Sequence, residues 1–180
     1  MDLFEEWINK DDELIECALT DKSYKSVYSK EHRKELSENK TNFKLATYGD
    51  AILKMCIMGI LYKKESKKPT EEKKKYESDK SLVLIAKKYN LLDRIKTNGE
   101  RVKSYDYEHN KTKKGNKCKY IATCVEALIA AIYINTRNID KLKKLTNRWM
   151  KYIDQNSWLI LISFLFRGEL INEFRFFIFI

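Results

Sequence analysis

The chain has 180 residues, of which 43% are hydrophobic and 34% are charged, and this composition suits one globular domain with a sizeable core. Five glycines and one proline are too few for a sheet with many tight turns, so the composition favours a mostly helical fold. The net charge of +10 has two readings: a polyanionic partner such as nucleic acid, or a surface that uses lysine for solubility.

Apolar spacing predicts helices along most of the chain, with polar loops at 23–42 and 97–118. Pro69, followed by Thr70 and two glutamates, predicts the start of a helix after a lysine-rich stretch. In chain order, the helical patterns cover residues 2–9, 12–20, 43–62, 71–89, 119–135 and 139–154.

The composition changes after Lys151, beyond which no lysine occurs. Two apolar runs follow, at 158–166 and 174–180, and each is too short to cross a bilayer as a helix. We therefore expect a domain at 1–155 and an apolar tail at 156–180, which either covers a hydrophobic groove or binds a partner. We expect no membrane partner.

The cysteines are Cys17, Cys56, Cys118 and Cys124. They form no CxxC pair and lack the close spacing of zinc ligands, so they read as reduced, packed thiols. The N-terminus is acidic and has no long apolar run, unlike a secretory signal. These features predict a reducing compartment, the cytoplasm or an organellar matrix.

Two carboxylates interrupt otherwise apolar helices: Asp50 within 43–62 and Glu126 within 119–135. Burying an unpaired carboxylate costs several kcal/mol, so each is expected to have a partner. One reading is local: each bonds to its own helix or to a nearby Lys or Arg. The other is that the two helices pack together and the carboxylates hold a hard cation, Mg²⁺ or Mn²⁺. Gly49, just before Asp50, favours the close approach of a second helix.

Four segments, in family order, resemble the catalytic domain of ribonuclease III: ALTDKSY (18–24), LATYGDAIL (45–53), YESDKSLVLIAKKYNLL (76–92) and ATCVEALIAAIY (122–133). The resemblance implies an all-α, ribonuclease III-like helical endonuclease domain that acts as a homodimer on double-stranded or structured RNA. It also implies that Asp50 and Glu126 bind Mg²⁺, with Mn²⁺ as a substitute, and are catalytic. No separate double-stranded-RNA-binding domain is expected.

Three positions depart from the longer enzymes of the family, where acids stand in place of Phe43, Ala46 and Thr123. The compact Mini-III branch resembles this chain at Ala46 and Thr123, and that likeness implies ribosomal RNA precursors as substrate. The alternative is a decayed, non-catalytic module that has kept RNA binding or dimerisation. Both readings place Asp50 and Glu126 at the same site.

A lysine-rich loop, KTKKGNKCK (111–119), precedes the helix of Glu126. Its Lys113, Lys114, Lys117 and Lys119 are the predicted RNA-binding residues, because phosphate contacts position a duplex without reading its sequence. The other interpretation is a solvated loop.

Overall fold

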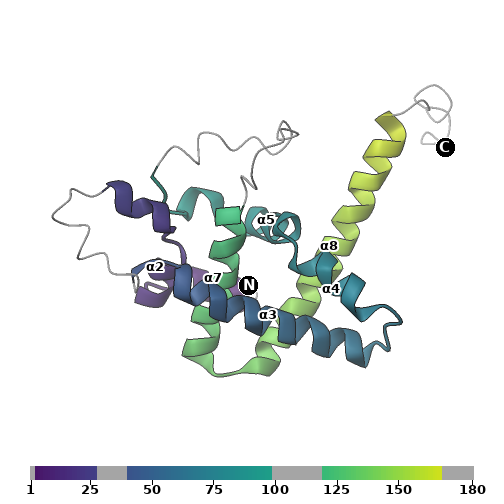
Figure 1. Cartoon of the computed structure of the whole chain (residues 1–180), viewed down its shortest axis with the longest axis horizontal. Coiled ribbons are helices and arrows are strands. Elements are labelled where there is room, and N and C mark those ends of the chain that lie inside the picture. Colours follow the sequence, from purple (N-terminus) through teal and green to yellow (C-terminus); the bar gives the residue numbers. More distant parts are fainter. Residues whose placement is uncertain (1–2, 28–39, 99–118, 168–180) are drawn as a thin grey trace.

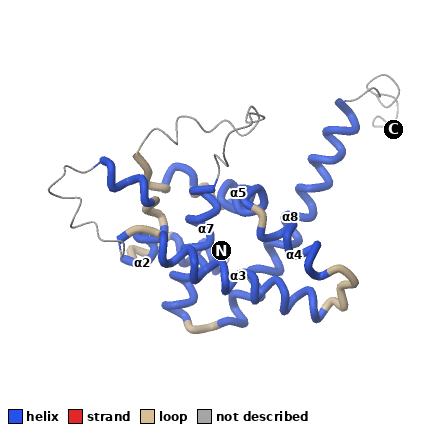
Figure 2. The backbone as a smooth tube through the Cα atoms, in the orientation of Figure 1, coloured by secondary structure: helices blue, strands red, loops and turns tan. Residues whose placement is uncertain are grey.

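The computed structural model describes residues 3–27, 40–98 and 119–167, and at 25–27 and 157–167 it describes the backbone only. Within these ranges the chain is helical and contains no strand (Figure 2). Its elements are α1 (Leu3–Ile8), α2 (Glu13–Ala18), the 3₁₀ helix η1 (Lys22–Val27), α3 (Phe43–Lys63), α4 (Pro69–Glu77), α5 (Asp79–Lys88), the 3₁₀ helix η4 (Leu92–Arg94), α7 (Lys119–Thr136) and α8 (Ile139–Arg167). The predicted all-α class is confirmed.

The centre of the fold is α7, which contacts α1, α2, α3, α5 and α8 (Figure 1). Its sequence is apolar on nearly all sides, and a helix of that kind has to be covered by other elements. Between Tyr120 and Ile132 only Thr123 and Glu126 are not fully buried. Its most extensive partner is α3, so the two helices that carry the predicted carboxylates pack against each other.

The single helical pattern expected over 71–89 is wrong, because the chain breaks at Ser78 into α4 and α5. Ser78 has an extended backbone, with ψ at 146°, and its hydroxyl accepts a hydrogen bond from the amide of Ser81. It is therefore the N-cap of α5, and the apolar period continues across the break. The helix start expected at Pro69 is confirmed.

The last described helix, α8, buries the apolar face expected of it, with Leu142, Leu145 and Trp149 inside the core. It continues past residue 154 without a break to Arg167. The helix therefore continues across the division expected between residues 155 and 156.

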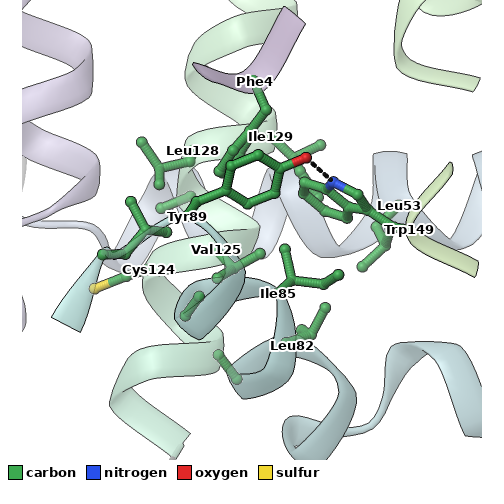
Figure 3. Close-up of a cluster of buried hydrophobic side chains, with 14 of the residues drawn as sticks. Phe4, Leu53, Leu82, Ile85, Tyr89, Cys124, Val125, Leu128, Ile129 and Trp149 are labelled. Carbon is green, nitrogen blue, oxygen red and sulfur yellow. Dashed lines mark hydrogen bonds between the residues drawn. The ribbon is translucent and has the colours of Figure 1, made fainter. Parts of the chain in front are cut away.

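An aromatic cluster joins α1 to α8 and to the C-terminal end of α5 (Figure 3). The ring of Phe4 lies 4.7 Å from that of Tyr89 and 5.0 Å from that of Trp149, measured between centroids. The indole Nε1 of Trp149 donates a hydrogen bond of 3.2 Å to the hydroxyl of Tyr89. Buried aromatic polar groups need such partners, so this bond fixes the cluster's geometry.

Candidate functional site

Asp50 and Glu126 come together where α3 crosses α7. At Gly49 the two helices approach so closely that a Cβ atom would lie 1.7 Å from the carbonyl oxygen of Glu126 and 3.2 Å from the amide nitrogen of Ala130. Only a glycine permits this approach, and the close approach expected at Gly49 is confirmed. It places the residue next to Asp50 directly against the backbone of Glu126.

The charge of Asp50 acts on the carboxyl group of Glu126. The pKa of Glu126 is raised to about 7, first by burial, then by the charges of Asp50 and Asp79. Lys54 and Lys119 act in the opposite direction without cancelling this effect. Burial and the neighbouring acids both disfavour the charged form of Glu126, and a bound cation would favour it.

A lysine already contacts Asp50. One turn further along α3, the Nζ atom of Lys54 lies 2.7 Å from Oδ2 of Asp50. This hydrogen bond, with the charges of Asp50, Glu77 and Glu126, raises the pKa of Lys54 despite a smaller opposing effect of burial. Lys54 is therefore the positive charge shared by this group of acids.

The donor set fits a hard divalent cation in its chemistry. Asp50 and Glu126 supply carboxylate oxygens, the ligands that Mg²⁺ and Mn²⁺ prefer. In the described part of the chain no third Asp, Glu, His or Cys joins them in a group able to hold a metal. Water or phosphate oxygens would therefore complete the coordination shell, as is usual for Mg²⁺.

Two of the three replaced acid positions, Ala46 and Thr123, lie beside the site without adding ligands. Ala46 is buried one turn before Asp50. Thr123, one turn before Glu126, uses its hydroxyl to donate a 2.8 Å hydrogen bond to the carbonyl of Lys119. The site is therefore a two-carboxylate site in the described structure.

Sequence reasoning missed Lys54, Asp79 and Glu77. Asp79 opens α5 directly after the Ser78 cap, and Glu77 closes α4 with an ion pair of 3.2 Å to Lys73. The available signal was the ordered resemblance of 76–92, because that segment is where α4 ends and α5 begins beside the site. Spacing within one helix could not place Asp79 and Glu77, whereas Lys54 follows Asp50 by one turn of the same helix.

Of the predicted RNA-binding lysines, Lys113, Lys114 and Lys117 lie outside the described residues. Lys119 is the first residue of α7, is exposed, and acts electrostatically on Glu126. A phosphate that contacts Lys119 would therefore lie on the side of the carboxylate pair.

A second basic surface lies on α8, on the face opposite its buried residues. We call it the α8 stripe, and its members are Lys141, Lys144, Arg148 and Lys151. All four are exposed at helical spacing. The α8 stripe faces away from the core and has as many cationic residues as the predicted RNA-binding set.

The outer face of α3 is apolar as well as its inner face. Its exposed apolar side chains are Phe43, Tyr48, Met55, Met58 and Tyr62. Met55 is 51% exposed and Tyr62 84%, although side chains of this kind are normally buried. Of the described helices, α3 alone is long and apolar enough to cross a membrane, a property that core helices share. A helix that is apolar on both faces leaves an exposed apolar surface on the outer side of the domain.

An all-α domain with a carboxylate pair between two core helices is the class that the fold and site define. The family model described as Ribonuclease-III-like matches residues 11–151. The chain belongs to the ribonuclease-III-like family.

Two relatives illustrate the similarity. Ribonuclease 3 of Clostridium kluyveri (strain NBRC 12016) is 33% identical over 131 residues, which are 70% of this chain and 47% of that protein. Ribonuclease 3 of Glaesserella parasuis serovar 5 (strain SH0165) is 27% identical over 126 residues, 68% of this chain and 52% of that protein. The chain thus spans about half the length of these curated relatives.

Proposed function

We propose that the protein is a metal-dependent endoribonuclease that cleaves double-stranded or structured RNA. The observation that carries the proposal is the meeting of Asp50 and Glu126 at the α3–α7 contact, with the pKa of Glu126 raised to about 7. The family and the relatives named Ribonuclease 3 support the same activity. Mg²⁺ is the proposed cofactor and Mn²⁺ its substitute.

Asp50 and Glu126 are the residues that would hold the metal. When bound there, a divalent ion lowers the pKa of a water and stabilises the negative charge that develops on the phosphate. The backbone of Glu126 is held by the close contact at Gly49, and Asp50 lies on the facing helix, so both residues are placed by packed helices. The products would carry a 5′-phosphate and a 3′-hydroxyl.

The proposed RNA surface includes Lys119 and the preceding lysines at 113, 114 and 117. The support for it is the position of Lys119 beside Glu126. The resemblance to the Mini-III branch at Ala46 and Thr123 favours ribosomal RNA precursors as the substrate.

We propose a homodimer formed through the outer apolar face of α3, with no membrane partner. Exposed methionines and tyrosines along one helix face suit a self-complementary protein contact. The domain is proposed to extend over 1–155 with a tail at 156–180. In the described part of the chain Cys17, Cys56 and Cys124 form no disulfide with one another, which supports a reducing compartment, the cytoplasm or an organellar matrix.

The decisive experiment incubates the protein with double-stranded RNA labelled on both strands, with Mg²⁺ or with EDTA. Cleavage should need the metal and should be lost in Asp50→Asn and in Glu126→Gln, while circular dichroism shows both variants folded. Asp140→Asn, which removes an exposed carboxylate from the first turn of α8, is the matched control and should cleave normally. Full cleavage by Asp50→Asn would refute the catalytic assignment.

The RNA surface is tested by the salt dependence of binding, in Ca²⁺ or EDTA to prevent cleavage. The loop variant replaces three lysines by glutamine: Lys113, Lys114 and Lys117. The matched control neutralises three members of the α8 stripe: Lys144, Arg148 and Lys151. Each lost phosphate contact should reduce the slope of log affinity against log salt by about 0.7–0.9. If the slope is smaller only in the α8 variant, the RNA binds the α8 stripe and not the loop.

A second candidate is a non-catalytic ribonuclease III-like module that binds RNA or dimerises in a larger assembly. The observation in its favour is the Lys54–Asp50 ion pair beside Ala46 and Thr123, because a lysine at the acid pair can replace the metal charge. Under this reading the wild-type protein binds the labelled RNA with high affinity and never cuts it, whichever divalent ion is supplied.

A further inference from the structure

The charged cluster at the α3–α7 contact contains its own cation. Lys54 follows Asp50 by one turn, and its Nζ lies 2.7 Å from Oδ2. An Asp that precedes a Lys by four residues is in the favourable order for a helical ion pair. Exposed pairs of this spacing contribute little by themselves, so the surroundings decide what this pair does.

Those surroundings contain acids from three other helices. Glu126 faces it from α7, Glu77 from the end of α4, and Asp79, at the start of α5, acts on Glu126. The other basic groups near the cluster are Lys73, which pairs with Glu77, and Lys119 at the start of α7. Lys54 is the basic group that donates a hydrogen bond to the carboxylate predicted to bind metal.

We propose that the Lys54 ammonium is a resident counter-ion of the carboxylate pair, and that a divalent ion binds Asp50 only by displacing it. The inference rests on the proposed metal site. The oxygen that accepts the Lys54 hydrogen bond has to turn toward the ion, and the ammonium has to move away from a second positive charge. The Lys54 side chain is 41% exposed, so it has solvent to move into.

The consequence is a metal affinity set by a residue that is not a ligand. A divalent ion on Asp50 and an ammonium in its present place would repel each other across a few ångströms. Removing the ammonium relieves the repulsion and frees the Asp50 oxygen. We expect divalent-ion affinity to rise by about tenfold when Lys54 is neutralised, from the Coulomb repulsion at such distances in a largely aqueous dielectric.

The test is a titration of the full chain with Mn²⁺, followed by the electron paramagnetic resonance signal of the free ion. The variants are Lys54→Met, which keeps the length of the stem, and Lys54→Arg, which keeps the charge. Lys63→Met is the matched control, because Lys63 lies on the same helix about 13 Å from Lys54 along the helix axis. Glu126→Gln in the Lys54→Met background shows whether the ion binds at the pair.

The expected result is tighter Mn²⁺ binding in Lys54→Met alone, with Lys54→Arg and Lys63→Met like the wild type, and loss of the gain with Glu126→Gln. A second readout is thermal unfolding: in EDTA the melting temperature of Lys54→Met falls below that of the wild type, and Mn²⁺ raises it by more. Equal binding by wild type and Lys54→Met would overturn the counter-ion role and leave the metal site standing. If neither protein binds Mn²⁺, the proposed metal site fails, and the counter-ion competition fails with it.

Discussion

Gly49 and Gly59 stand ten residues apart in α3, and the same substitution should have opposite effects at the two positions. At Gly49 a Cβ atom would meet the carbonyl oxygen of Glu126 at 1.7 Å and its carbonyl carbon at 2.6 Å. At Gly59 it would meet only the Cε atom of Lys143, at 3.8 Å, an ordinary contact with a flexible side chain. Gly49→Ala therefore tests the α3–α7 contact, and Gly59→Ala is its control.

The magnitudes follow from two opposing effects. Alanine is favoured over glycine in a helix interior by about 1 kcal/mol, which is the whole effect expected at Gly59. At Gly49 the atoms in the way are backbone, so the two helices have to separate, and overpacking of this kind costs about 1–3 kcal/mol or more. Because α3 and α7 make the most extensive helix contact, we place the cost above that range and expect a net loss of about 2 kcal/mol or more.

The assay is urea and thermal unfolding followed by circular dichroism at the helix band. For a chain of this length 1 kcal/mol corresponds to about 2–4 °C in melting temperature. Gly49→Ala should melt about 4–8 °C below the wild type, and Gly59→Ala should melt about 2–4 °C above it. An unchanged or higher melting temperature for Gly49→Ala would refute the close contact, and with it the placement of Asp50 beside Glu126.

Three further predictions concern the charge, the core and the surface. Glu126 has a folded-state pKa above its ordinary value of 4.5, so its favourable contribution to folding stability is complete below about pH 4.5 and is lost as pH rises through about 7. In EDTA, Glu126→Gln should therefore be more stable than the wild type by about 1–3 kcal/mol at pH 8 and equal to it at pH 4, as measured by urea unfolding. Tyr89→Phe leaves the buried indole N–H of Trp149 unpaired and should cost about 1–3 kcal/mol in the same assay; no loss would mean that water replaces the hydroxyl. Met55→Glu should convert a dimer to monomers in sedimentation velocity while Arg148→Glu on α8 does not, and a monomeric wild type would contradict the proposed α3 interface.

Much of the helical framework can be predicted from the sequence because long apolar runs have few alternatives. The segments 43–62 and 119–135 are too apolar and too long to be loops, and both are helices in the structure. The break at Ser78 could not be predicted from apolar spacing, because the period of 3.6 continues across it. A continuous helix and a broken one differ here only in capping chemistry: the hydroxyl of Ser78 accepts a hydrogen bond from the backbone amide of Ser81, three residues later.

The candidate site, like the fold, could be predicted from the sequence only in part. Asp50 and Glu126 stand out because each interrupts an apolar helix, but their meeting depends on which face of α3 packs on α7. Because both faces of α3 are apolar, apolar spacing does not show which face packs on α7. The resemblance to ribonuclease III predicted the packing, and Gly49 supported it only weakly. Lys54 was missed because a lysine one turn after an aspartate is typical of an ordinary surface pair. Its role depends on acids from three other helices, which no local pattern contains.

The two apolar faces of α3 also affect the Lys54–Asp50 ion pair, which lies between them. Asp50 and Lys54 lie on the edge that separates the buried face, which contains Gly49, from the outer face with Met55. A second copy of the chain on the outer face would border this edge and remove water from it. Electrostatic interactions strengthen when water is excluded, so dimerisation should tighten the Lys54–Asp50 pair and make it harder for a divalent ion to displace Lys54. Mn²⁺ affinity should therefore be higher in Met55→Glu than in the wild type at concentrations where the wild type is dimeric. Equal affinities would show that the interface and the acid pair act independently.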